Sequence, residues 1–200
     1  MKKDATPIQT KLSKMFPFLS DSDIETFLEI CQYKTFKGKE TIFQAGTTTR
    51  KVCFVVSGFI RGYVINSEGV EKNLILRGEG KFSSVPEWLF SDMPTKYNFE
   101  ALLDSELLIC KIQDFEALAK KNPALFDLYI LALKENLSII AYRLESMILF
   151  SPEERYKDLL DKNPQLFQTA FNKHIANFLG ITPISLSRII KRIKDGVPSN

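Results

Sequence analysis

The sequence predicts an α+β fold in which short antiparallel strands come first and helices follow. Two observations carry this prediction. Seven of the nine glycines fall between positions 38 and 80, where they separate short runs rich in Val, Ile, Phe and Tyr. Beyond Asp114 the apolar residues change to the period of helices. Turn signals at spacings of about 8–12 residues are typical of an antiparallel sandwich or barrel rather than of alternating βαβ units.

Composition limits the class of protein. The chain has 200 residues, 44% hydrophobic and 26% charged, which is typical of a soluble globular protein with one ordinary domain or two small ones. No apolar run approaches the roughly 18–20 residues that span a bilayer, and the start MKKDATPIQTK lacks the apolar core of a secretory signal. Because Cys31, Cys53 and Cys110 are odd in number and widely spaced, we expect small core residues in a reducing cytoplasm, with neither a disulfide framework nor a zinc site.

The charge is unevenly distributed. The formal net charge is only +3, from 27 Lys and Arg against 24 Asp and Glu. Six basic residues and no acidic ones occupy positions 162–194, so subtracting +6 from +3 leaves −3 on the other 167 residues. A basic end on a mildly acidic body predicts a polyanionic partner. A solvated basic face without a partner is the alternative.

The N-terminal half predicts one helix and then strands. Residues 20–31 begin with a capping Ser20 or Asp21 and have a single apolar face, which predicts the helix. Asn66 to Gly69 predicts a hairpin turn, because Gly69 can take a positive φ. The predicted strands share a β-branched and aromatic composition and lie at 41–43, 52–56, 59–65, 72–76, 97–102 and 107–112.

A long helix is predicted next. Asn122 and Pro123 open it, and 19 of the 27 residues from Ala124 to Phe150 are apolar or aromatic. An ordinary surface helix has one apolar stripe, whereas this one is apolar over most of its circumference. We therefore expect two partners, the β domain and the same helix of a second subunit. The alternative is a helix buried wholly within a monomer.

The C-terminal segment predicts a helix-turn-helix. Ser151-Pro152 begins a new helix and marks the best domain boundary in the chain. A short helix over 174–179, a turn at Gly180 and a helix over about 182–193 follow, the last capped by Thr182 with Pro in its first turn. This is the spacing of two helices that pack at a steep angle. A generic helical hairpin is the alternative.

The second of these helices has polar and basic groups suited to DNA. Hydroxyl and guanidinium groups near a helix N-terminus can bind phosphate oxygens and guanine edges in a major groove. His174 lies close by, near a phosphate or, as we expect, facing solvent. The side chains that we expect to contact DNA are Lys173, Thr182, Ser185, Ser187, Arg188, Lys191 and Arg192.

This order of elements resembles the Crp/Fnr family of bacterial transcription regulators. The resemblance covers roughly residues 12–195 and is most specific from Leu179 to Arg192. In the β part it is carried by Lys37-Gly38, Gln44-Ala45-Gly46, the pair of runs from Phe54 to Arg61 and the run from Leu102 to Ile109.

The resemblance implies three domains and a set of partners. A sensor domain with an N-terminal antiparallel β-roll or jelly-roll occupies 1–122, a long dimerisation helix 123–150, and an all-α helix-turn-helix domain 151–200. The protein is then a homodimer that reads a palindromic site on double-stranded DNA. RNA polymerase is a further partner, and no membrane is involved.

Departures from the family pattern concern the ligand site. Members that bind cyclic nucleotide open a phosphate-binding cassette with Phe-Gly-Glu and close it with Arg followed by Ser or Thr. This chain has Phe82-Ser83-Ser84 and Thr95-Lys96 at these places. Since a lysine does not replace a bidentate guanidinium, we expect no cyclic nucleotide as cofactor. We expect instead an empty remnant of the pocket, with aromatic side chains as its lining: Phe82, Trp88, Tyr97 and Phe99.

Other departures concern the DNA-binding end. Ile184 stands where many members have a Glu that reads cytosine, so we expect contact with a thymine methyl and a different target sequence. Only Gly-Val-Pro-Ser-Asn follows Asp195, which predicts a truncated wing with fewer backbone contacts. An alternative function follows, namely a ligand-sensing protein with a weakened DNA-binding end that acts through protein partners.

Three further classes are not expected. The cysteines are not clustered as in iron–sulfur members of the family, and the single histidine lies outside the β domain, where a haem-sensing member needs a ligand. An enzyme is not expected either, because the sequence has no nucleophile–base pair, no metal-ligand spacing and no phosphate-binding glycine loop.

Overall fold

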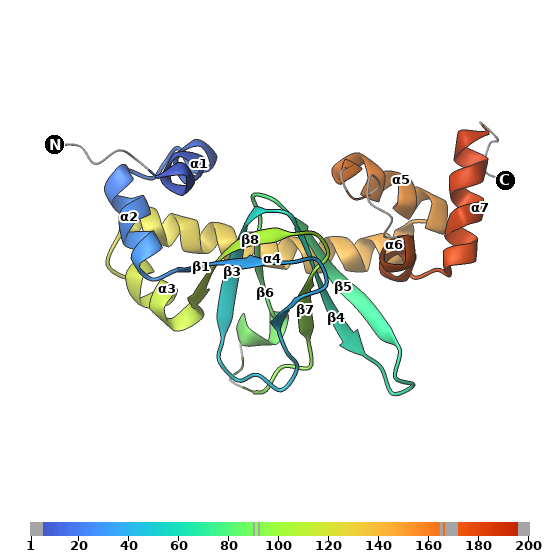
Figure 1. Cartoon of the computed structure of the whole chain (residues 1–200), viewed down its shortest axis with the longest axis horizontal. Coiled ribbons are helices and arrows are strands. Elements are labelled where there is room, and N and C mark those ends of the chain that lie inside the picture. Colours follow the sequence, from blue (N-terminus) through green and yellow to red (C-terminus); the bar gives the residue numbers. More distant parts are fainter. Residues whose placement is uncertain (1–5, 90, 92, 165, 167–171, 196–200) are drawn as a thin grey trace.

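The computed structural model describes residues 6–195 apart from 90, 92, 165 and 167–171. It is elongated, with a β-roll in the middle and helices at both ends, and one long helix passes along the roll to connect them (Figure 1). The helices are α1 (Pro7–Met15), α2 (Asp21–Glu29), α3 (Ile112–Ala119), α4 (Pro123–Leu149), α5 (Pro152–Lys162), α6 (Asn172–Leu179) and α7 (Pro183–Lys194), with a short 3-10 helix η1 (Pro86–Leu89). The strands are β1 (Gln32–Phe36), β2 (Thr41–Phe43), β3 (Lys51–Ser57), β4 (Phe59–Ile65), β5 (Glu71–Gly78), β6 (Phe82–Ser84), β7 (Asn98–Ala101) and β8 (Ser105–Lys111).

The roll consists of two four-stranded antiparallel sheets, with strand orders β1-β8-β3-β6 and β2-β7-β4-β5. The predicted antiparallel β-roll is confirmed. The hairpin between β4 and β5 turns where the sequence predicted it: Gly69 has φ +75°, and the Asn66 Oδ1 accepts the N–H groups of Glu68 and Val70 at 3.1 and 2.8 Å. At Gly58, between β3 and β4, a Cβ would lie 2.4 Å from the Asp104 carbonyl oxygen, so only glycine allows the sheets to approach here.

All six strand runs predicted from composition are present, but β1 and β6 were not predicted. β1 is an edge strand whose residues are almost all exposed, so its sequence QYKTF has no buried apolar face to reveal it. β6 is only three residues long and two of them are Ser, although all three are buried. Its pairing with β3, Phe82 opposite Phe54, is a tertiary contact that local sequence does not specify.

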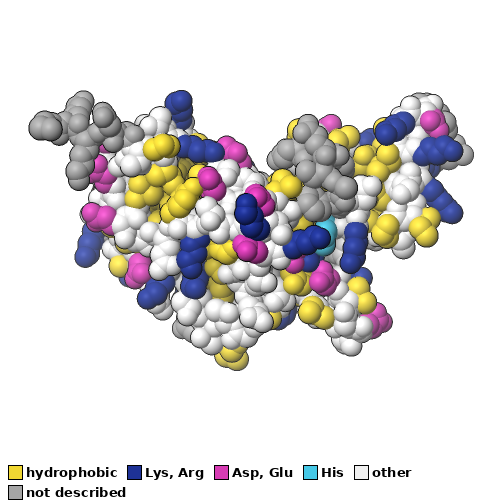
Figure 2. All heavy atoms as spheres, in the orientation of Figure 1, with side chains coloured by type: hydrophobic (Ala, Val, Ile, Leu, Met, Phe, Trp, Pro, Cys, Tyr) yellow, Lys and Arg dark blue, Asp and Glu magenta, His cyan; other side chains and the backbone are white. Residues whose placement is uncertain are grey.

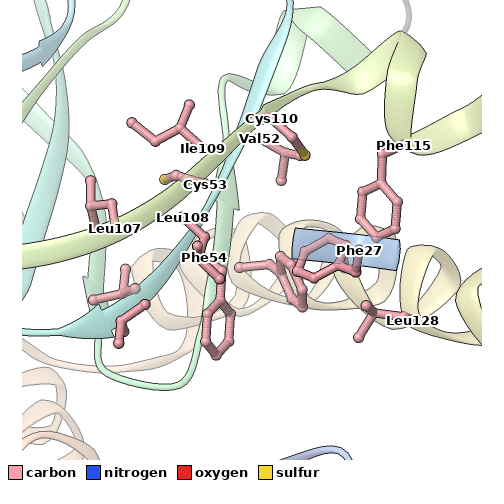
Figure 3. Close-up of a cluster of buried hydrophobic side chains, with 14 of the residues drawn as sticks. Phe27, Val52, Cys53, Phe54, Leu107, Leu108, Ile109, Cys110, Phe115 and Leu128 are labelled. Carbon is pink, nitrogen blue, oxygen red and sulfur yellow. The ribbon is translucent and has the colours of Figure 1, made fainter. Parts of the chain in front are cut away.

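The main core fills the space between the sheets and the helices α1 to α4. Phenylalanine rings form much of it. The ring centroids of Phe54 and Phe82 lie 4.9 Å apart. Those of Phe27 and Phe115, which face each other in Figure 3, lie 5.2 Å apart. These rings come from β3, β6, α2 and α3, so the core ties the N-terminal helices to the roll. Phe82 belongs to this core rather than to a cavity wall.

A second core joins the roll to the C-terminal helices. Phe59, Leu76 and Leu102 of the roll pack in one buried cluster with residues of α5, α6 and α7, among them Ile175 and Leu186. The C-terminal helices are therefore packed against the β-roll by apolar contacts as well as being linked to it through α4.

The helix α4 has one covered and one uncovered apolar face. Asn122 caps it by accepting the N–H groups of Ala124 and Leu125. Its buried positions pack on the roll, as predicted for one partner. We call the uncovered positions the open face of α4: Leu137, Ile140, Leu144 and Ile148 are 66, 40, 62 and 70% exposed. Among the described helices, none is long and apolar enough to cross a membrane.

Candidate nucleic-acid interface

The helices α6 and α7 form the predicted helix-turn-helix. Gly180, at φ +74°, makes the turn that the sequence predicted there. Thr182 caps α7, and its side-chain oxygen accepts the Ser185 N–H at 3.1 Å. Ile175 and Leu186 are completely buried, so each helix turns its apolar face toward the other. This packing leaves the opposite face of α7 to solvent.

Five of the seven side chains predicted to contact DNA are exposed: Lys173, Thr182, Ser187, Arg188 and Lys191. Four of them lie on or next to α7, and Lys and Arg side chains stand on the surface of this end as well as elsewhere on the visible face (Figure 2). The Ser185 hydroxyl is half-buried and lies 3.0 Å from the Thr182 hydroxyl, so it is part of the helix cap. The truncated wing was predicted at residues 196–200, which lie outside the described residues.

Arg192 has a second partner besides solvent, although its side chain is 41% exposed and its contact with DNA stays a prediction. Its Nε lies 3.1 Å from the Glu153 Oε2, and the Glu153 side chain is only 8% exposed. Glu153 also forms an i,i+4 pair with Lys157 at 2.9 Å. This ion pair joins α7 to α5, and loss of the guanidinium would leave the nearly buried carboxylate with less compensation. Sequence spacing could not reveal the contact.

Sequence reasoning missed Arg155, which positions the motif relative to α4. Arg155 is 8% exposed. Its Nε donates to the Leu179 carbonyl oxygen at 3.1 Å and its Nη1 to that of Phe150 at 2.7 Å. One guanidinium thus binds the last carbonyl groups of both α6 and α4, where the helix dipoles favour a cation. In the sequence it was one charge among several in a capped helix.

Side-chain amides hold α6 against β5. The Asn73 N–H donates to the Asn177 Oδ1 at 2.6 Å, and the Asn177 Nδ2 donates to the Glu71 carbonyl oxygen at 2.7 Å. The Asn73 Nδ2 in turn donates to the His174 carbonyl oxygen at 3.0 Å. Asn73 also binds the buried Arg61 guanidinium at 2.8 Å. Polar contacts thus extend from the interior of the roll to the helix-turn-helix.

His174 was expected to face solvent, but the structure places it only partly in solvent. It is half-buried on α6 beside this contact. Burial lowers the pKa of its imidazole, and the positive charge of Arg61 lowers that pKa further. The neutral form is therefore favoured in the folded protein.

The segment Phe82–Ser84, which corresponds to the start of the phosphate-binding cassette, is strand β6 and is fully buried. Its N–H groups bind side chains of α4. The Phe82 N–H donates to the Glu135 Oε2 at 2.8 Å, and the Ser84 N–H donates to the Asn136 Oδ1 at 3.0 Å. Two backbone donors that could otherwise face a phosphate are therefore already bonded.

The second half of the predicted ligand site is equally occupied by local contacts. Thr95 is 2% exposed, and its hydroxyl accepts the Tyr97 N–H at 2.9 Å. Lys96 is 73% exposed and lies 3.7 Å from the Glu87 carboxylate. Ser83, like Thr95, is buried. Of the five predicted pocket residues, only Lys96 is therefore accessible, and its charge is partly compensated.

The prediction of an empty pocket lined by aromatic side chains is wrong for three of the four rings. Phe82, Trp88 and Phe99 are 1, 0 and 0% exposed. Phe43 packs between the last two, with ring centroids 5.5 Å from each. Phe43 and Phe99 lie on one sheet and Trp88 on η1. Phe82 packs against Phe54 of the other sheet and against rings at the end of α1 and on α2 and α3. The rings therefore pack against neighbouring side chains rather than line a cavity. Tyr97 is half-buried.

The cysteines are core residues, as predicted. Cys53 and Cys110 are buried and Cys31 is half-buried. Burial raises the pKa of the Cys53 thiol to about 12, which disfavours a reactive thiolate. Among the described residues, no three His, Cys, Asp or Glu side chains come together in a way that could hold a metal ion.

The comparisons with known proteins agree with this geometry. Residues 33–122 match the cyclic nucleotide-binding domain family. No curated protein matches the chain. Among solved structures, FixK2 from Bradyrhizobium japonicum is similar at 17% identity, with a TM-score of 0.69 over 84% of this chain and 86% of that one.

Two more structures extend the similarity. CooA from Carboxydothermus hydrogenoformans, solved as a mutant, has 18% identity and a TM-score of 0.64 over 84% of this chain and 78% of that one. A transcriptional regulator from Eubacterium rectale, described as of the Crp/Fnr family, has 15% identity and a TM-score of 0.66 over 97% and 89%. At these identities the likeness concerns the fold. Residues 33–122 therefore match the cyclic nucleotide-binding domain family, and the chain as a whole has the fold seen in the Crp/Fnr regulators.

Proposed function

We propose that the protein is a DNA-binding transcription regulator of the Crp/Fnr type and not an enzyme. The observation that carries this proposal is the outer face of α7, where Arg188 and Lys191 stand exposed on a capped helix of a helix-turn-helix. Residues 162–194 contain six basic and no acidic residues, so the potential around this helix favours a polyanion. The helix enters the major groove of double-stranded DNA, and its first turns contact base edges.

The proposed regulator is a homodimer. The open face of α4 has apolar residues at steps of three and four, which is the spacing of a two-helix interface. Pairing of this face with its copy covers the side chains that the single chain leaves exposed. Two copies of α7 then read the two halves of a palindromic site about one helical turn apart, roughly 34–36 Å.

Three consecutive segments of the chain have different roles in the proposed regulator. Residues 1–122 form the sensor domain, 123–150 the dimerisation helix and 151–200 the DNA-binding domain, and the dimer acts on transcription through RNA polymerase. The sensor domain does not bind cyclic nucleotide. Support comes from the buried strand β6, whose N–H groups are bonded to α4, and from Thr95, which cannot pair with a cyclic phosphate as a guanidinium does.

The test measures DNA affinity directly. Full-length protein is used to enrich duplexes from a random-sequence library, and the affinity for the enriched duplex is measured by fluorescence anisotropy. Arg188→Ala is expected to weaken binding by about 1–3 kcal/mol, roughly 5- to 150-fold. Lys34→Ala, which removes an exposed charge from β1 far along the chain, serves as the matched control and leaves the affinity unchanged.

Salt dependence provides the second measurement. Each phosphate that the protein neutralises adds about −0.9 to the slope of log affinity against log salt concentration. Lys191→Ala is expected to lower the steepness by about one such step. If no duplex is enriched and the wild-type protein shows no salt-dependent DNA affinity, the proposal is wrong.

One observation favours a second candidate function. Ile184, in the first turn of α7, is 67% exposed, and an exposed apolar residue on a recognition helix suits a protein surface as well as a thymine methyl. The second candidate is a ligand-sensing protein that acts through protein partners. It predicts a ligand response without DNA binding, so the anisotropy measurement separates the two functions.

A further inference from the structure

A cavity of about 480 Å³ lies where the sensor domain, α4 and the DNA-binding domain meet. Its walls come from β5, α4, α5 and α6, with Lys81 just ahead of β6. This volume falls within the usual range for small-molecule sites, about 300–1,000 Å³. None of its lining residues was predicted from the sequence to contact a ligand or DNA. Lys162 entered the sequence prediction only as one of the six basic residues of positions 162–194.

Arg77 is the unusual residue of this cavity. Its Nη2 donates to the Glu135 backbone carbonyl oxygen, but its buried Nε has no hydrogen-bond partner among the described residues. No carboxylate of the described part of the chain forms an ion pair with it. Burial lowers the pKa of the guanidinium, although the Glu135 carboxylate partly offsets this effect. An unpartnered donor of a charged group in a recessed site is costly unless an acceptor binds there.

The other charged side chains at the cavity form two ion pairs, so the net charge with Arg77 is +1. Lys81 lies 3.0 Å from the Glu135 carboxylate, and Lys162 lies 2.8 Å from that of Asp158. Both lysine side chains are 54% exposed, so they stand at the rim. Two lysines balanced by two acids leave the charge of Arg77 uncompensated. A ligand with a single negative charge therefore complements the site.

The remaining walls are largely apolar. They include the side chains of Leu76, Ile139, Leu159 and Phe178, which belong to four different elements. The Tyr142 ring adds an aromatic surface, with the Lys162 ammonium 4.0 Å from its centroid. Such walls favour an organic body over an inorganic ion. Together with the charge, they indicate an amphipathic monoanion.

The cavity stays open in the proposed dimer. At 100° per residue, Ile139 and Tyr142 lie about 140–160° around α4 from Leu137 and Leu144, and Ser138 lies on the flank, about 100–120° from them. Pairing of the open face with a second copy therefore does not cover the cavity.

We propose that this cavity binds a small organic monocarboxylate whose carboxylate pairs with Arg77 and whose apolar body packs between β5 and the C-terminal helices. Because its walls belong to the sensor domain, α4 and the DNA-binding domain, an occupant contacts all three at once. Such a ligand favours the arrangement of domains in which these walls fit it best. The effector site then lies outside the roll. Its role as an effector site rests on the proposed function, but binding itself does not.

The test uses the full chain without DNA, with 1-naphthoate as probe and 1-naphthamide as its uncharged analogue. Binding is measured by isothermal titration calorimetry and by saturation-transfer NMR. We expect saturable binding of the carboxylate, and binding of the amide about tenfold weaker or more, as for the loss of one charged hydrogen bond. Equal affinity for the two probes, or no saturable binding of 1-naphthoate up to millimolar concentration, overturns the proposal.

Two variants locate the site. Arg77→Gln is expected to weaken 1-naphthoate binding about tenfold or more, whereas Lys72→Gln, at an exposed position of the same strand, leaves it unchanged. Ser138→Trp places a large side chain from an exposed position of α4 into the cavity and abolishes binding, which keeps the proposal testable if Arg77→Gln fails to fold. Unchanged binding by Ser138→Trp overturns it. Since no DNA is present, a failure here is separate from a failure of DNA binding.

Discussion

Replacement of Leu144 by Asp tests whether the open face of α4 forms the dimer. Leu144 is 62% exposed in the single chain. Complete burial of a leucine is worth about 1.5–3 kcal/mol, so covering this exposed part gives about 1–2 kcal/mol per subunit. Two subunits give about 2–4 kcal/mol, which corresponds to about 30- to 900-fold in the dimer dissociation constant. Two facing carboxylates in an apolar interface weaken the dimer further.

The assay is sedimentation velocity over a range of protein concentrations. Leu144→Asp is expected to sediment as a monomer where the wild type is a dimer, and to lose affinity for a palindromic duplex because two copies of α7 no longer bind together. Ile65→Asp is the matched control. It makes the same kind of change at an apolar side chain that is 57% exposed, but on the β4–β5 hairpin. Circular dichroism checks that α4 remains helical.

Two outcomes refute the reasoning. If Leu144→Asp keeps the dissociation constant of the wild type, the open face of α4 is not the interface. If Ile65→Asp is as disruptive as Leu144→Asp, the effect comes from the introduced charge and not from its position. The milder Leu144→Ala removes only apolar area and is expected to shift the same equilibrium in the same direction by a smaller amount.

Two further predictions concern the contact between the sensor domain and α6. Asn177→Ala leaves the buried Asn73 N–H and the Glu71 carbonyl oxygen without their partner, and urea unfolding should show a loss of about 1–3 kcal/mol, against less than about 0.5 kcal/mol for the exposed Lys173→Ala. Equal losses in the two variants contradict the assigned contact. Folding lowers the pKa of His174 below the ordinary 6.5, so as the pH falls the unfolded chain takes up this proton before the folded chain does. The contribution of His174 to the free energy of unfolding is therefore complete above pH 6.5 and is lost as the pH falls below that value. His174→Gln should lose less stability over this range, and a pH profile identical to that of the wild type contradicts the prediction.

Local signals in the sequence predicted much of the fold. Ser20, Asn122 and Thr182 each cap a helix where the sequence placed a helix start. A cap acts within one turn of chain, so its residues are neighbours in the sequence. For the same reason Gly69 and Gly180 mark real turns, since each has the positive φ that its turn requires. The long helix α4 was predicted from its Asn122-Pro123 start and its apolar composition.

Contacts between distant parts of the chain could not be predicted in this way. Asn177 binds residues of β5 more than a hundred positions earlier. The sequence predicted that Arg192 is an outward-facing basic residue of α7, and its ion pair with Glu153 of α5 is evident only in the structure. Polar side chains are ambiguous in a sequence because solvent, DNA and a buried partner all satisfy them. The candidate DNA-binding residues were therefore predicted best where helix phase alone decides exposure, as for Arg188.

The bonding of β6 changes where a signal can enter this fold. Glu135 and Asn136 of α4 bind the β6 backbone without any ligand, so the strand and the helix are already fixed to each other. Phe82 of the same strand also packs against rings of β3, at the end of α1 and on α2 and α3. The contact of β5 with α5 and α6 is different, because it combines a few amide hydrogen bonds with an adjacent cavity that contains an uncompensated Arg77. A ligand acts only through states that it binds unequally, and an occupant of this junction contacts both the β-roll and the C-terminal helices. Regulation of the DNA-binding end is therefore expected to act between the domains rather than from inside the roll.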